Sequence, residues 1–200
     1  MRIFLFFQQT ILVIRAFAYG LFNWPLPFFS LRMRKRKEFE RLNLTDPHSK
    51  PFEKSAAVAF HVASEGELEQ VRPLIDRFIE KNKRVELIYT SESVEERCSN
   101  LALEHSELIR IFRLPLLCYF PWPDLAGQNL SDFISAKKII LCRYDFYPEL
   151  LLRGARRDTC FILVSAALKR KKELKWPFNI YTKALYGLFD IIISSNDSEK

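Results

Sequence analysis

One stretch decides the fold: "AAVAFHVASEGELEQVRPLIDRFI", residues 56–79. Its first third, residues 56–63, is an unbroken apolar run of the kind that forms a strand buried on both faces of a sheet. From Leu68 onward the apolar residues recur every three or four positions, as they do along one side of a helix. The stretch therefore predicts a buried strand that is followed directly by an amphipathic helix.

Four residues, Ser64-Glu65-Gly66-Glu67, separate that strand from that helix. Ser64 followed three positions later by Glu67 has the spacing of a capping box, which stabilises the first helical turn by about 1 kcal/mol. A carboxylate at a helix N-terminus also stays ionised through the helix dipole, so Glu67 could act as a general base. Gly66 would let a substrate approach the backbone. The two interpretations are compatible, and the spacing leaves both open.

The same alternation of strand and helix continues along the chain. Short apolar runs rich in β-branched and aromatic residues predict further strands at 84–90, 108–114, 138–142, 159–165 and 189–194. Helical patterns fill most of the gaps, so we expect an α/β fold: a Rossmann-like parallel sheet with helices on both faces. Ligands of such sheets bind at the carboxyl ends of the strands, which narrows the candidate site to one edge.

The N-terminal segment, residues 3–31, is strongly apolar and aromatic. It is long enough to cross a bilayer, but two glutamines, an arginine and two prolines interrupt it. We predict a membrane-anchoring helix that lies in or dips into the bilayer, with a single-pass anchor and a soluble arm as alternatives. A basic run follows that would contact lipid phosphates at the cytoplasmic face. Its members are Arg32, Arg34, Lys35, Arg36 and Lys37.

Charge supports a division of the chain into three parts. Residues 1–50 hold nine Lys or Arg against three Asp or Glu, whereas the remaining residues hold 22 basic and 21 acidic side chains. A nearly neutral body argues against nucleic-acid binding. We predict an anchor with its basic segment at 1–41, a linker at 42–54 and an α/β domain at 55–200.

The sequence lacks the usual motifs for several kinds of ligand binding. No GxGxxG and no GxxxxGK[ST] occurs, which disfavours dinucleotide and P-loop phosphate binding. The four cysteines lie 18 to 24 residues apart without a CxxC or a Cys/His cluster, so we expect no metal. We expect no cofactor either.

Three motifs in order resemble the Kdo transferases, the membrane-associated enzymes that attach 3-deoxy-D-manno-octulosonic acid (Kdo) to lipid A. The first family signature, His-x-x-Ser-x-Gly-Glu, is matched by His61 and the residues that end at Glu67. The second is similar to "RYDFYPEL", residues 143–150, which includes Asp145. The third is similar to "SAALK", residues 165–169. The anchor and the basic run fit the family as well, so the resemblance covers nearly the whole chain.

The resemblance implies a function for the domain. It would be the acceptor-side, N-terminal half of a GT-B glycosyltransferase in lipopolysaccharide biosynthesis, on the cytoplasmic face of the bacterial inner membrane. Glu67 would be the general base, while Ser64, Gly66 and Asp145 would bind the acceptor, which is lipid A or its precursor. CMP-Kdo would be the donor, and a C-terminal donor-binding domain, which residues 55–200 do not supply, would act in cis or in trans.

Two departures keep an alternative open. Arg143 stands where the second family motif begins with Glu, and Ala167 stands where the third has Arg. These changes favour a non-catalytic, membrane-attached α/β binding protein derived from such an enzyme. A membrane-anchored scaffold that recruits other proteins has only the anchor in its favour.

Overall fold

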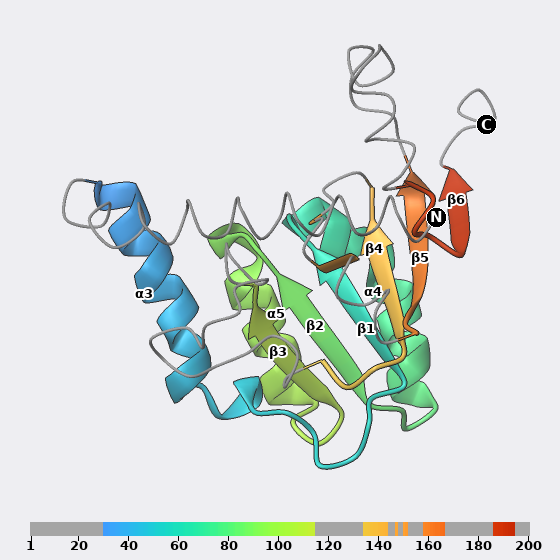
Figure 1. The fold of residues 1–200 in the computed structure, drawn as a ribbon. Helices are drawn as coiled ribbons and strands as arrows, with labels where there is room; N and C mark the ends of the chain where they lie inside the picture. Colours follow the sequence, from blue (N-terminus) through green and yellow to red (C-terminus); the bar gives the residue numbers. More distant parts are fainter. Residues whose placement is uncertain are drawn as a thin grey trace, which may run out of the picture.

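The computed structural model describes residues 30–114, 134–143, 147, 150–151, 158–166 and 186–194. In these residues, parallel strands form one six-stranded sheet in the order β3-β2-β1-β4-β5-β6 (Figure 1). The strands are β1 (Val58–Val62), β2 (Val85–Tyr89), β3 (Ile109–Arg113), β4 (Lys138–Cys142), β5 (Cys160–Ala166) and β6 (Ile191–Ser194). The helices are α3 (Leu31–Thr45), α4 (Glu65–Glu80) and α5 (Glu95–Glu104), with short 3₁₀ turns η1 (Pro47–Ser49) and η2 (Glu92–Val94).

The sheet confirms the predicted parallel α/β fold. Each strand lies within two residues of its predicted position at either end, and β4 has the predicted bounds. All five residues of β1 are buried, as are all five of β2, because β1 has strands on both sides and packed side chains on both faces. A run of mostly apolar residues is therefore the correct signal for these central strands, although β1 contains His61 and β2 contains Glu86.

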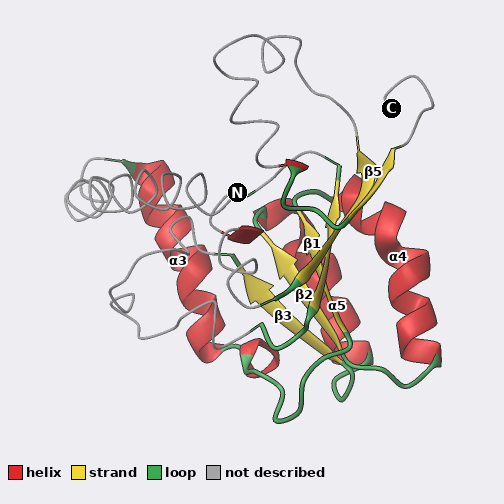
Figure 2. Ribbon diagram, turned by 45° about the vertical axis from the view of Figure 1, so that its right-hand side comes forward, coloured by secondary structure: helices red, strands yellow, loops and turns green. Residues whose placement is uncertain are grey.

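Helices α4 and α5 cover one face of the sheet (Figure 2). Phe60 of β1 and Leu87 of β2 point into the core on this face, together with Val71 and Ile75 of α4. The opposite face has its own core around Phe161. In the described part of the chain, that second core is closed by short pieces, not by a full helix. These pieces contribute Ala56, Ile134, Ala136, Leu150, Leu151, Tyr186 and Leu188.

Helix α3 lies along the edge strand β3 (Figure 1). The side-chain amide of Asn43 donates to the carbonyl oxygen of Arg113 at 2.8 Å and accepts from its N–H at 2.9 Å, as a neighbouring strand would. This covers an edge that would otherwise present unpaired backbone groups. Helix α3 spans parts of two ranges for which the sequence predicts a basic juxtamembrane segment and a linker. It continues to Thr45 because these contacts with β3 stabilise its last turns.

Candidate functional site

The candidate site lies at the carboxyl ends of β1 and β4. These two strands pair side by side, and the strand order reverses between them: β2 and β3 follow on one side, β5 and β6 on the other. Such a reversal opens a crevice outside the carboxyl ends of the two strands, where α/β proteins bind ligands. Ser64 to Glu67 follow β1, and Arg143 follows β4. The topology therefore brings the first two sequence motifs to one place.

Glu67 is held at the start of α4 by a modified capping box. Ser64 is the N-cap, and its hydroxyl accepts a hydrogen bond from the N–H of Glu67 at 3.3 Å. The Glu67 carboxylate reaches back to the N–H of Ala63 at 2.7 Å, one residue before the N-cap. Glu67 is only 3% exposed. The predicted cap is therefore present, and it fixes this carboxylate beneath the surface of the crevice.

The two acids that flank Gly66 have different surroundings. Glu65 is exposed and pairs with Arg97 of α5 at 3.4 Å, and the same guanidinium also bonds Glu69. Such exposed pairs contribute at most about 1 kcal/mol. Glu65 thus joins α4 to α5 at the surface, whereas the Glu67 side chain points inward at the crevice.

Gly66 lies in open space. A Cβ atom added there would have no protein atom within 4 Å. Neither packing nor a crowded backbone therefore requires glycine at this position. Any requirement for it would come from a molecule that approaches the first turn of α4.

The carboxyl end of β4 is linked to α4 by Gln70, which lies one helical turn after Glu67. The Gln70 amide oxygen accepts from the Cys142 thiol at 3.3 Å and from Nε of Arg143 at 3.4 Å. The pKa of Cys142 is raised to about 11, chiefly because the thiol is buried; the negative charge of Glu67 raises it further, and Arg143 opposes the shift. Glu67 and Arg143 therefore both act electrostatically on the same buried thiol.

A second link joins the first two motifs. The ring of His61 in β1 meets the ring of Tyr147 edge to face, with centroids 5.1 Å apart. His61 is 1% exposed and therefore lies inside the sheet layer, as expected for a core histidine. Asp145, predicted to bind the acceptor, lies outside the described residues.

Left-handed backbone occurs just after β4 and at the next-to-last residue of β5, where the pairing with β6 is irregular. Arg143 has φ 63° and Ser165 has φ 53°. This conformation costs a residue other than glycine roughly 1 kcal/mol or more, and such residues concentrate at functional sites. Ser165 begins the third motif, so two motif residues adopt this conformation at adjacent strand ends. Ala167 to Lys169 lie outside the described residues.

The basic run divides into two groups on α3. Arg36 is half-buried: it donates to the carbonyl oxygens of Thr90 and Leu114, which follow β2 and β3, and pairs with Glu40 at 2.8 Å. This bond set holds the N-terminal half of α3 at the carboxyl edge of the sheet. Lys37 is also half-buried. The exposed members are Arg32, Arg34 and Lys35.

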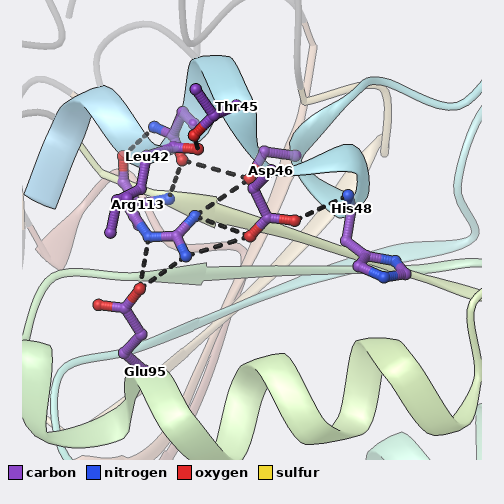
Figure 3. A network of polar contacts seen from close by, with 8 residues as sticks. Leu42, Thr45, Asp46, His48, Glu95 and Arg113 are labelled. Carbon is purple, nitrogen blue, oxygen red and sulfur yellow. Dashed lines mark hydrogen bonds and ion pairs between the residues drawn. The ribbon is translucent and has the colours of Figure 1, made fainter.

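Sequence reasoning missed an arginine cluster below α3. Arg113 of β3 is 3% exposed and pairs with Asp46 at 3.1 Å and Glu95 at 2.6 Å (Figure 3). The Ser49 hydroxyl accepts a further bond from it at 3.2 Å. A charged residue at the end of an apolar run was the only signal in the sequence, because its partners come from distant segments. The cluster joins α3, η1 and α5 to β3 and is structural.

A comparison with protein-family models decides the identity of this domain. The model of the N-terminal domain of 3-deoxy-D-manno-octulosonic-acid transferase (kdotransferase) matches residues 34–200. The chain belongs to the Kdo transferase N-terminal family. No curated protein matches it closely.

Membership gives the Kdo transferase domain a glycosyltransferase-like function and confirms the resemblance noted in the motifs. The matched range includes α3 from its second turn onward, so this helix belongs to the family domain.

Two further properties, metal binding and membrane spanning, concern the described part of the Kdo transferase domain. There, no group of three or more His, Cys, Asp or Glu side chains could hold a metal ion. None of the described helices is long and apolar enough to cross a bilayer. The predicted anchor, residues 3–31, lies almost wholly outside the described residues. The anchor and the expected absence of a metal both stay predictions.

Proposed function

We propose that this chain is the acceptor-side domain of a membrane-associated, inverting Kdo transferase. It would take Kdo from CMP-Kdo and attach it to lipid A or its precursor. One observation carries the proposal: a buried carboxylate, Glu67, starts a helix at the strand-order reversal of a domain that belongs to this family. A donor-binding domain in cis or in trans completes the site.

Glu67 is the general base in this mechanism. Its carboxylate takes the proton from the acceptor hydroxyl as that oxygen attacks the anomeric carbon of Kdo. The bond from that carbon to the phosphate of CMP breaks, CMP leaves with the bonding electron pair, and the configuration inverts. The hydrogen bond from Ala63 and the dipole of α4 favour the ionised carboxylate before the proton is taken. No metal takes part in these steps.

The neighbours of Glu67 orient it and admit the acceptor. Ser64 fixes the first turn of α4, and the open space over Gly66 accommodates the sugar. Asp145, two residues beyond Arg143, would hold the acceptor or orient Glu67. The resemblance to the family motifs supports these roles.

The membrane lies on the same side as the site in this proposal. Arg36 attaches the N-terminal half of α3 to the carboxyl edge of the sheet. Arg32, Arg34 and Lys35 are exposed there and would contact anionic lipid, at about 1 kcal/mol each. The body would then lie on the cytoplasmic face of the bacterial inner membrane, beside its lipid substrate.

A non-catalytic binding protein is the second candidate, and one observation favours it. The Glu67 carboxylate already has a structural partner in Ala63, and Arg143 replaces an acid of the family motif. In that case the crevice would bind the acceptor without transferring sugar to it.

Transfer is tested directly with the full-length protein, together with its donor-binding domain. It is incubated with CMP-Kdo and a lipid A precursor, and the product is detected by mass spectrometry. We expect a product carrying Kdo from wild type and at least 100-fold less from Glu67→Gln, roughly the contribution of a general base. Wild-type rates in Glu67→Gln would remove Glu67 as the base. Binding of the precursor without any product would favour the second candidate.

A further inference from the structure

Arg143 is the chain's own departure from the family at the crevice. It follows β4 directly, beside the end of β1, and its N–H donates to the carbonyl oxygen of Val164 in β5 at 2.8 Å. This bond and the left-handed φ of 63° fix the direction in which its side chain leaves the sheet. The direction is toward α4, because its Nε lies 3.4 Å from the amide oxygen of Gln70.

The guanidinium of Arg143 is hydrogen-bonded to a neutral side chain, the amide of Gln70. Within the described residues, its guanidinium is bonded by the Gln70 amide and by no carboxylate. Gln70 lies three positions after Glu67 on α4, so both side chains are on the same side of that helix. A guanidinium oriented by an amide keeps its full charge for another partner, and its planar fork matches carboxylate and phosphate groups.

We propose that Arg143 is a specificity-determining residue that binds an anionic oxygen group, a carboxylate or a phosphate, of a sugar substrate beside Glu67. The inference rests on the proposed function and adds the substrate feature that this chain selects. An acid at this position would repel such a group. In this chain the side chain at that position is positively charged instead.

The anion has two possible sources, which share this chemistry. The carboxylate belongs to the Kdo unit of the donor, and the phosphate belongs to the acceptor. Binding of a free carboxylate sugar and of a sugar phosphate can be measured separately, without any transfer taking place.

The test uses the full chain in nonionic detergent and isothermal titration calorimetry. The probes are Kdo against its neutral methyl ester, and N-acetylglucosamine 1-phosphate against neutral N-acetylglucosamine. The variants are Arg143→Gln, Arg143→Lys and Arg143→Glu. The control is Arg77→Gln, an exposed arginine near the other end of α4.

We expect Arg143→Gln to lower the affinity for one of the two anionic probes about tenfold or more. The affinity for the neutral counterpart of that probe should not change. Arg143→Lys should keep part of that affinity, Arg143→Glu should lose the most, and Arg77→Gln should bind as wild type does. The anion that is affected identifies the source.

The inference would be overturned by equal anion binding to wild type and Arg143→Gln, by tighter anion binding to Arg143→Glu, or by no binding of either anion to wild type. An equal loss of anionic and neutral probes, together with a lower unfolding temperature, would assign Arg143 a structural role instead. Anion binding that depends on Arg143 without any Kdo transfer would refute the proposed function and keep this inference. Kdo transfer by Arg143→Gln with a wild-type KM would refute this inference and keep the proposed function.

Discussion

The carboxylate of Glu67 accepts a hydrogen bond from the backbone N–H of Ala63 at 2.7 Å, across the junction between β1 and α4. This bond joins Ala63, the residue that follows β1, to the first turn of the helix. It means that the proposed catalytic base also stabilises the fold. Substitutions at this position therefore have to separate two effects.

Glu67→Ala should lower stability as well as activity. The variant leaves the Ala63 N–H, which is half-buried, without its acceptor, and this loss costs about 1 kcal/mol or more. Glu67→Gln keeps one acceptor oxygen and should lose less than half as much. Urea unfolding of both variants measures the difference. Equal losses would mean that the Ala63 bond has little weight.

Gly66→Ala should be tolerated by the protein itself. The new methyl group meets no atom within 4 Å, and alanine in a helix is favoured over glycine by about 0.5–1 kcal/mol. We expect unchanged or slightly higher stability in urea unfolding. If the acceptor approaches here, its KM should rise several-fold. An unchanged KM would exclude close approach at Gly66.

Substitutions of the basic residues of α3 should have different effects for exposed and for half-buried positions. Removing Arg32, Arg34 and Lys35 together by Gln substitution should reduce the preference for anionic over neutral vesicles by roughly 100-fold, with stability unchanged. Vesicle sedimentation measures this preference. Arg36→Met should instead lower the free energy of unfolding, because it removes the bonds to Thr90 and Leu114. A triple variant with the wild-type lipid preference would refute the lipid contact.

Arg113→Met should be strongly destabilising. It leaves the Asp46 and Glu95 carboxylates without their shared partner; because their side chains are still 17% and 24% exposed, we expect a loss of about 2–4 kcal/mol. Arg97→Met removes an exposed pair on α5 and should change stability by less than about 0.5 kcal/mol. Thermal and urea unfolding compare the two variants. Similar losses would mean that burial of Arg113 adds nothing.

Glu86 should make stability depend on pH. Burial raises its pKa above 4.5, against hydrogen bonds from Ser135 and Ala136, so the folded protein holds the proton more tightly than the unfolded chain does. Its contribution to stability is therefore greatest below the unfolded pKa and declines as the pH rises through the folded pKa. Gln cannot ionise, so the deficit of Glu86→Gln relative to wild type should shrink as the pH rises above 4.5.

Urea unfolding at several pH values measures that deficit. Glu104→Gln, a substitution on the exposed side of α5, is the matched control and should show no such trend. A constant deficit for Glu86→Gln would show that Glu86 does not ionise over the pH range measured, and a deficit that widens with pH would show that folding lowers its pKa.

The sequence by itself determined the strands, their order along the chain and the cap at Ser64. These features depend on local periodicity and on contacts between residues a few positions apart, which the sequence displays directly. It also placed the first two motifs at strand ends, because parallel strands must present their carboxyl ends at one edge.

Only the tertiary structure decided which of those ends are neighbours and what each charge does there. The order β3-β2-β1-β4-β5-β6 puts Arg143 beside Glu67, and packing of α3 on β3 turns Arg36 from a candidate lipid contact into a bond between elements. Arg113 and its partners come together from segments up to 67 residues apart. A charged side chain takes its role from what surrounds it, and those surroundings exist only once distant parts of the chain have packed together.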